Sequence, residues 1–191
     1  MKTDIILSGV GGQGILSIAA VIGQAAVDMG LSMKQAEVHG MSQRGGDVQS
    51  HLRLSDKPVA SDLIPKGKAD LIISLEPMES LRYLPFINPT SGVIVSNVEP
   101  VKNINNYPEV DGLLSEVKKY KHVILDVSDI AKKLGSGRMA NIVMLGAASP
   151  FIDIPYEKFE EGIRRIFARK GEDVVAMNIK ALQAGRDAAQ Q

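Results

Sequence analysis

The residues best suited to chemistry in this sequence are closely spaced glycines near the amino terminus. Gly9, Gly11, Gly12 and Gly14 surround Gln13 in a GxGGxG pattern, between an apolar segment and a predicted helix. Glycine permits a tight turn and leaves the amides at the start of a helix open to an approaching anion. The pattern therefore predicts either phosphate binding, or close packing of the helix against a strand or another subunit.

A second candidate anion site lies in the SQRGG segment. Its residues are Ser42, Arg44, Gly45 and Gly46, together with an intervening glutamine. A guanidinium presents several N–H donors in a fixed fork, and the neighbouring glycines can expose backbone amides. Such a group suits a carboxylate, a phosphate or a facing acidic side chain, although a surface turn with an incidental arginine accounts for the same residues.

A third glycine-rich segment, residues 135–138 (GSGR), precedes Asn141 and Gly146. We predict structural roles here, in which Asn141 caps a helix and Gly146 permits a close helix crossing. The carboxylate pair Glu76 and Glu79 is expected at a solvated helix start, where the helix dipole explains it without any acid–base role.

The sequence predicts no catalytic residues and no metal site in this chain. The three histidines are scattered and have no neighbouring ligand at metal-binding spacing. Cysteine is absent, which excludes disulfides, thiolate nucleophiles and iron–sulfur clusters held by cysteines of this chain. No nucleophile stands beside a recognisable base.

The amino-acid composition narrows the classes of protein to which this chain can belong. The chain has 191 residues, of which 45% are hydrophobic, and we expect residues 1–191 to form a single domain. Its 22 basic residues balance its 22 acidic residues, which argues against nucleic acid or an anionic membrane as a partner. With no signal-peptide pattern and no apolar stretch of about 18 residues, the expected location is the cytoplasm.

The elements that must position these residues are short apolar strands alternating with helices. Buried strands are predicted at residues 4–10, 69–75, 92–97 and 121–126, a short strand at 32–38, a loop at 40–46, and an alternating, half-exposed strand at 47–54. Helices are predicted at residues 12–29, 77–83, 113–120, 127–134, 141–148, 156–170 and 172–188. The predicted fold is a three-layer, Rossmann-like α/β domain with a mostly parallel sheet and some antiparallel strand.

The first helix, predicted over residues 12–29, is unusually apolar. Its strongly polar side chains are Gln13, Ser17, Gln24 and Asp28, which lie within about 60° of one another around the helix. A helix with so narrow a polar stripe is buried on most sides. We expect it to pack both inside the domain and beneath a partner subunit.

Three separated motifs resemble, in order and approximate spacing, the gamma-type domain of 2-oxoacid:ferredoxin oxidoreductases. They are DIILSGVGGQGILSIA, GMSQRGGDVQSHLRLSD and GSGRMANIVMLGA, and the ending VVAMNIKALQAG extends the resemblance over nearly the whole chain. Within that family, the stretch EVHGMSQRGG in a free-standing chain of this size is most similar to the beta subunits of the indolepyruvate type.

The resemblance implies the small subunit of a hetero-oligomeric oxidoreductase that acts in amino-acid catabolism and converts an aryl 2-oxoacid to an acyl-CoA. It implies that a larger partner subunit holds thiamine diphosphate and 4Fe–4S clusters, and that the complex passes electrons to ferredoxin. This chain would bind no cofactor firmly. It would help to close the active-site region and to seat coenzyme A, using the amides of residues 9–14 or the side chain of Arg44.

Three alternatives stay open on the residues alone. A stand-alone NAD(P)-binding Rossmann-type oxidoreductase would use the glycine turn, with Glu37, 23 positions after Gly14, on the ribose. Adenylating enzymes also open with GxGGxG, but their companion carboxylate and cysteine chemistry is not recognisable here. A scaffold subunit would bind no small molecule at all.

Overall fold

The computed structural model of the chain describes residues 1–39 and 45–190, and within them six strands form one sheet. The order is β2-β3-β1-β4-β5-β6. Strand β3 runs antiparallel to both β1 and β2, whereas β1, β4, β5 and β6 are parallel to one another, as predicted. The bounds are β1 Lys2–Val10, β2 Ser32–His39, β3 Asp47–Ser55, β4 Leu71–Ser74, β5 Val93–Asn97 and β6 Lys121–Leu125.

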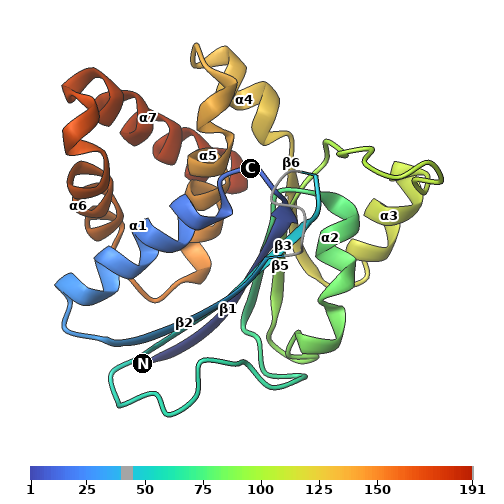
Figure 1. Cartoon of the computed structure of the whole chain (residues 1–191), viewed down its shortest axis with the longest axis horizontal. Coiled ribbons are helices and arrows are strands. Elements are labelled where there is room, and N and C mark those ends of the chain that lie inside the picture. Colours follow the sequence, from blue (N-terminus) through green and yellow to red (C-terminus); the bar gives the residue numbers. More distant parts are fainter. Residues whose placement is uncertain (40–44, 191) are drawn as a thin grey trace.

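Helices cover both faces of this sheet, which confirms the predicted three-layer α/β architecture (Figure 1). The larger layer contains α1 Ile15–Asp28, α4 Val127–Lys133, α5 Ala140–Ala148, α6 Tyr156–Phe167 and α7 Glu172–Ala189. The opposite face carries α2 Pro77–Arg82 and α3 Val110–Val117.

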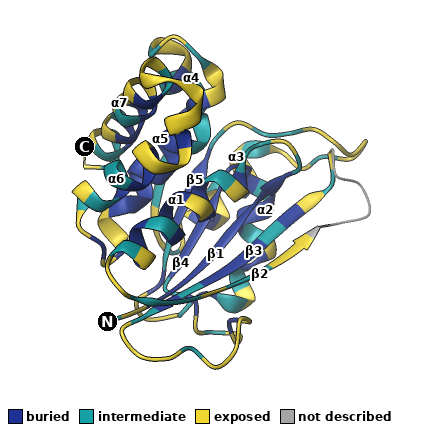
Figure 2. Cartoon of the chain, turned by 60° about the vertical axis from the view of Figure 1, so that its left-hand side comes forward, coloured by how far each residue is buried: buried dark blue, intermediate teal, exposed yellow. Residues whose placement is uncertain are grey.

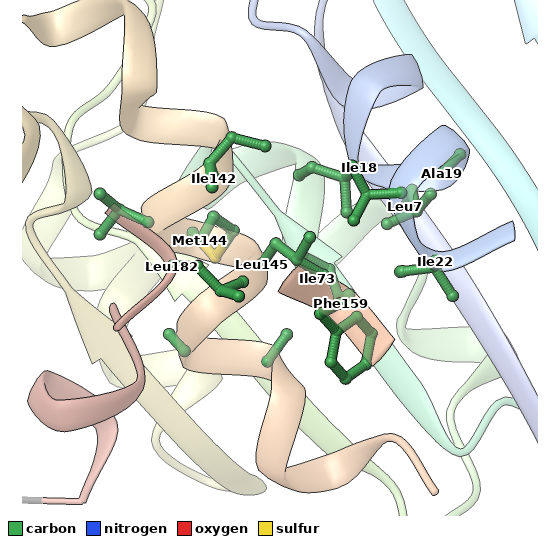
Figure 3. Close-up of a cluster of buried hydrophobic side chains, with 14 of the residues drawn as sticks. Leu7, Ile18, Ala19, Ile22, Ile73, Ile142, Met144, Leu145, Phe159 and Leu182 are labelled. Atoms are coloured by element: carbon green, nitrogen blue, oxygen red, sulfur yellow. The ribbon is translucent and has the colours of Figure 1, made fainter. Parts of the chain in front are cut away.

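Alternate residues of the parallel strands enter two cores on opposite faces of the sheet. The larger core packs the first helix layer against residues such as Leu7 and Ile73, with Phe159 of α6 fully buried between them and α1 (Figure 3). The smaller core lies under α2 and α3 and contains Ile6 and Ile72. Because both faces are covered, these strands appear in the sequence as continuous apolar runs.

Three helices differ from their predicted bounds by three residues. Helix α6 ends at Phe167 and not at Lys170, because residues 168–170 form a 3-10 turn. Helix α1 begins at Ile15 and not at Gly12, because Gly12 and Gly14 have φ angles of +101° and +83°, which no α-helix contains. Helix α3 begins at Val110, three residues earlier than expected. The glycine pattern thus forms a turn ahead of the helix and takes no part in its first turn.

Helix α1 is buried against the sheet and α6 as predicted, but its outer side is apolar and uncovered. Leu16 and Val27 are 41% and 56% exposed, whereas the polar Ser17, Gln24 and Asp28 are only partly exposed (Figure 2). The chain therefore presents apolar side chains to its surroundings along this helix.

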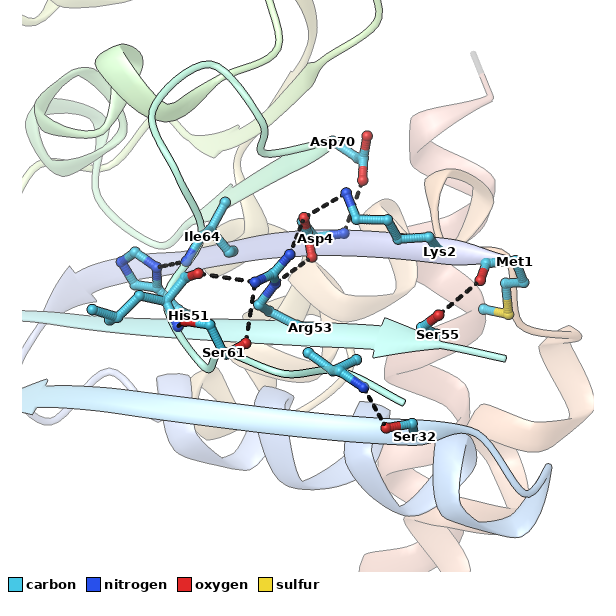
Figure 4. A network of polar contacts seen from close by, with 12 residues as sticks. Met1, Lys2, Asp4, Ser32, His51, Arg53, Ser55, Ser61, Ile64 and Asp70 are labelled. Atoms are coloured by element: carbon cyan, nitrogen blue, oxygen red, sulfur yellow. Dashed lines mark hydrogen bonds and ion pairs between the residues drawn. The ribbon is translucent and has the colours of Figure 1, made fainter. Parts of the chain in front are cut away.

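The prediction that β3 is half-exposed is wrong, because the segment that follows β3 folds back over its polar face. His51 is 4% exposed, and the Arg53 guanidinium lies between that segment and β1 (Figure 4). Arg53 Nε and Nη2 donate to the carboxylate of Asp4 at 2.8 and 3.2 Å, and Nη1 donates to the carbonyls of Ser61 and Leu63 at 3.1 and 3.0 Å. His51 and Arg53 can occupy this covered face because each has hydrogen-bond partners there.

Candidate anion-binding site

The carboxyl ends of the parallel strands open onto a crevice of about 350 Å³. Its wall includes the glycine turn after β1, Leu75 after β4, Asn97 at the end of β5 and Val127 after β6. The chain leaves β1 toward the α1 layer and leaves β4 toward α2 on the opposite face, so the crevice lies where the direction of winding changes (Figure 1). Ligands of open α/β sheets bind at such a switch point.

The turn at residues 9–14 is fixed in a way that leaves two amides available. The Gln13 amide donates to the last carbonyl of β1 at 3.1 Å, and the Gly11 amide donates at 2.9 Å to the segment before β3. The amides of Gly12 and Gly14 have no hydrogen-bond partner among the described residues. A Cβ atom at Gly12 would meet nothing within 4 Å, so a ligand can approach this part of the turn closely.

The side chain of Gln13 braces the turn and is not a free donor. Its Oε1 accepts from the Val10 amide at 2.7 Å, and its Nε2 donates to the Leu75 carbonyl at 3.0 Å, which joins β1 to β4. A Cβ atom at Gly9 would lie 2.7 Å from the same Oε1. Of the predicted site residues, Gly9 and Gln13 therefore shape the turn, and Gly12 and Gly14, whose amides have no partner among the described residues, line the crevice.

The structure adds Arg138 to the crevice, a residue to which the sequence analysis assigned no role of its own. Its side chain is exposed and forms no hydrogen bond or ion pair with any residue that the structure describes. None of the described residues that line the crevice is acidic. The residues that line the crevice therefore include an arginine with an unpaired guanidinium and two glycines with open amides, which are donor groups that anions prefer.

Two asparagines hold the crevice in shape. The N-cap position of α5 is Met139 and not Asn141 as predicted, although Asn141 Oδ1 does accept from the Ile142 amide in the first turn at 3.0 Å; its Nδ2 donates to the Gly14 carbonyl at 3.2 Å and ties α5 to the glycine turn. Asn97 Nδ2 donates to the Leu75 carbonyl at 3.3 Å, and its Oδ1 accepts from the amides after β5 and β6 at 3.0 and 3.2 Å. Sequence reasoning missed both contacts because each crosses between distant segments.

The SQRGG segment is described only at its end. Ser42 and Arg44 lie outside the described residues, whereas Gly45 and Gly46 lie next to the glycine turn. The Gly46 carbonyl accepts the hydrogen bond from Gly11 at 2.9 Å. The structure thus brings the end of the second predicted anion segment against the first.

An apolar groove of about 460 Å³ lies beside the same turn, between α1 and β3. Val10, Ile15, Leu16 and Val48 line it together with the turn glycines. The turn therefore borders two surfaces of different character, a crevice lined by polar residues and Arg138 and an apolar groove.

The prediction of a solvated carboxylate pair at the start of α2 is wrong. Glu76 and Glu79 are 0% and 1% exposed. Glu76 caps α2 by accepting from the Glu79 amide at 2.9 Å, and the Glu79 carboxylate pairs with Arg82 Nε at 2.7 Å. This hydrogen-bonded pairing raises the pKa of Arg82 above its usual value.

The dinucleotide alternative finds no support in the strand order. Glu37 lies on β2, an edge strand, and β3 separates β2 from the glycine turn at the end of β1. The Glu37 carboxylate accepts from Gln35 Nε2 at 2.6 Å. In a dinucleotide site the acidic residue follows the strand next to β1, which is not the arrangement here.

Two further features of the described residues bear on the site. No group of three or more His, Asp and Glu side chains among them is placed to hold a metal ion. None of the helices in residues 1–39 and 45–190 is long and apolar enough to cross a membrane.

Comparison with known proteins places this arrangement in a family. The sequence pattern of the pyruvate ferredoxin/flavodoxin oxidoreductase family matches residues 4–188. The indolepyruvate oxidoreductase subunit IorB of Archaeoglobus fulgidus is 38% identical over 198 residues, which cover 99% of this chain and 96% of that protein.

Two solved structures share the fold. The gamma subunit of a keto/oxoacid ferredoxin oxidoreductase from Geobacter sulfurreducens is 25% identical, with a TM-score of 0.71 over 98% of both chains. The 2-oxoglutarate:ferredoxin oxidoreductase from Magnetococcus marinus, solved with 2-oxoglutarate, coenzyme A and succinyl-CoA bound, is 24% identical with a TM-score of 0.79. The match covers 99% of this chain but 31% of that longer polypeptide. Because the family pattern and the Archaeoglobus relative both match nearly end to end, the chain belongs to the pyruvate ferredoxin/flavodoxin oxidoreductase family.

Proposed function

We propose that this chain is the small subunit of a cytoplasmic, indolepyruvate-type 2-oxoacid:ferredoxin oxidoreductase. Such a complex decarboxylates an aryl 2-oxoacid oxidatively, transfers the acyl group to coenzyme A and passes the electrons to ferredoxin. The support for this assignment is the family membership of the chain and its end-to-end similarity to a free-standing indolepyruvate oxidoreductase subunit.

The observation that carries the proposal is that the crevice is equipped to bind and not to react. It offers the amides of Gly12 and Gly14 and the guanidinium of Arg138, with no nucleophile and base in contact among its described residues. This supports a division of labour in which a larger partner subunit holds thiamine diphosphate and the 4Fe–4S clusters. The chain contains no cysteine thiolate with which to ligate such clusters itself.

The phosphate groups of coenzyme A suit this donor set. Backbone amides beside a helix start and a guanidinium both match phosphate oxygens, and charge-assisted hydrogen bonds of this kind are the stronger ones in proteins. Arg44 is a second candidate cation, because Gly46, two residues further along the sequence, contacts the glycine turn. We propose that this chain supplies one wall of the coenzyme A site and the partner supplies the other.

The test is the KM for coenzyme A of the complex reconstituted with its large subunit. Arg138→Gln removes the positive charge and keeps most of the side-chain length. Losing one charge-assisted hydrogen bond should raise this KM about tenfold and leave kcat within about twofold of wild type, because binding is lost equally in ground and transition states.

Arg164→Gln is the matched control. Arg164 is an exposed arginine on α6, away from the residues that line the crevice. It should leave the KM for coenzyme A unchanged. Equal KM values for Arg138→Gln and wild type would remove coenzyme A from this crevice, while the activity of the wild-type complex would still decide the subunit assignment.

A further inference from the structure

Glu76 is a buried carboxylate that holds two segments together beside the crevice. Its Oε2 accepts from the Glu79 amide, and its Oε1 accepts from the Val101 amide at 3.2 Å and from the hydroxyl of Tyr107 through a short hydrogen bond. All three donors are neutral, so the contacts are hydrogen bonds and not an ion pair. Burial and the neighbouring Glu76 raise the pKa of Tyr107 well above its usual range, which keeps its hydroxyl proton available for donation.

These contacts fix the segment 98–109, which is largely exposed and has no regular secondary structure. Val101 and Tyr107 lie on either side of Asn103, so the carboxylate fastens the segment on both sides of that residue. A fully buried carboxylate that accepts several hydrogen bonds is costly to disturb, since each lost donor leaves a buried oxygen atom without a partner.

The fastened segment reaches the glycine turn through a short chain of contacts. Asn103 Nδ2 donates to the Gly45 carbonyl at 2.7 Å, and the next carbonyl, that of Gly46, accepts from the Gly11 amide at 2.9 Å. Glu76 itself follows Leu75 in the chain, and the Leu75 carbonyl accepts the hydrogen bond from Gln13 Nε2 that stabilises the same turn. The carboxylate is therefore connected to the glycine turn both through the 98–109 segment and along the chain.

We propose that Glu76 is a positioning residue for the anion crevice, acting through Tyr107, Asn103 and Gly45 to hold the glycine turn in its binding conformation. The proposal rests on the proposed function, because the ligand whose affinity it controls is the coenzyme A assigned to that crevice. The proposal accounts for the contacts of Glu76 with Val101 and Tyr107, which neither capping of α2 nor solvation of the carboxylate explains.

Two variants test the connection without removing the carboxylate. Tyr107→Phe deletes the hydroxyl and preserves the ring, and Asn103→Ala deletes the contact with Gly45 from an exposed position. In the reconstituted complex, each should raise the KM for coenzyme A about fivefold with kcat within about twofold of wild type, as expected when a site is less well organised for binding. A double variant should be no worse than the more severe single variant, because both act through one segment.

A second measurement concerns the turn itself and needs no ligand. In the full isolated chain, hydrogen exchange of the Gly11 amide should accelerate about tenfold in both variants, because the carbonyl that protects it is less firmly held. The melting temperature of Asn103→Ala should match wild type, which separates loss of positioning from loss of folding.

Tyr120→Phe and Asn105→Ala are the matched controls, since they make the same chemical changes at residues that form none of these contacts; Asn105 lies in the same segment as Asn103 and Tyr107. KM values equal to those of the controls, or unchanged Gly11 exchange in both test variants, would overturn the positioning role. Failure of the proposed function would look different. The wild-type complex would then show no acceptor reduction that depends on coenzyme A, and the exchange rates alone would decide whether Glu76 holds the turn.

Discussion

The polar face of β3 shows how single residues set the conditions under which this fold is stable. The ring of His51 packs edge-on against Phe86, with 5.4 Å between ring centroids, and its Nδ1 accepts from the Ile64 amide at 3.0 Å. Burial, and secondarily the charge of Arg53, lower the pKa of His51 below 6.5. The folded chain therefore keeps this histidine neutral, with the ring proton on Nε2.

This histidine predicts a pH dependence of stability. Below about pH 6.5 the unfolded chain binds a proton at His51 that the folded chain resists, so the free energy of unfolding should fall as the pH drops through that value. Replacing it by glutamine, His51→Gln, should flatten the dependence by up to about 1.4 kcal/mol per pH unit. Urea unfolding from about pH 5 to about pH 8 measures the slope.

The control is His122→Gln, which changes an exposed histidine and should retain the wild-type slope. If His51→Gln and wild type lose stability equally on acidification, the protonation of His51 is not coupled to folding as described.

At the scale of elements, the tightest packing joins α5 and α7. A Cβ atom on Gly146 would collide with the carbonyl oxygen of Leu182, and one on Gly185 would collide with that of Val143. The two helix backbones are therefore in direct contact, which confirms the close crossing predicted at Gly146. Its partner glycine on α7 was not foreseen, because no local pattern identifies it.

The crossing makes Gly146→Ala a strongly destabilising change. The added methyl group must push the helices apart, and overpacking of this kind should lower the free energy of unfolding by about 2–3 kcal/mol. Gly112→Ala on α3 is the contrasting case, because a Cβ atom there meets nothing within 4 Å. It should raise stability by about 0.5–1 kcal/mol by restricting the unfolded chain. Chemical denaturation compares the two, and equal effects would contradict the close approach.

The strands and helices of this chain could be predicted because each produces a hydrophobic pattern within its own short stretch of sequence. The continuous apolar runs gave the parallel strands, and the alternation in residues 47–54 gave β3. Burial of the polar residues was not predictable, because the partner of each lies far along the chain: Asp4 for Arg53 and Tyr107 for Glu76. Polarity alone assigns such side chains to solvent.

The candidate site was also predictable only where its residues form a local sequence pattern. The glycine turn is a local pattern, and its position at the end of β1 follows from it. Arg138 joins that turn only because the parallel strands bring their carboxyl ends together, which requires the strand order to be known. Ser42 and Arg44, outside the described residues, stay predictions.

At the scale of the whole molecule, three features support a chain that works against a larger partner. The crevice is lined by hydrogen-bond donors with no nucleophile and base in contact among its described residues, and the groove beside the same turn is apolar. The outer side of α1 exposes Leu16 and Val27. Apolar surface adjoining a binding crevice suits an interface at which a ligand is shared between subunits.

The most direct test of the central claim is a reconstitution assay in which this chain is titrated into the purified large, thiamine-dependent subunit that we propose as its partner. The measured quantity is reduction of ferredoxin, or of a viologen dye, with indolepyruvate and coenzyme A. We predict no activity for either subunit alone, and activity in the mixture that rises with added chain and then saturates. Full activity of the large subunit without this chain, or reduction of NAD by this chain alone, would contradict the account.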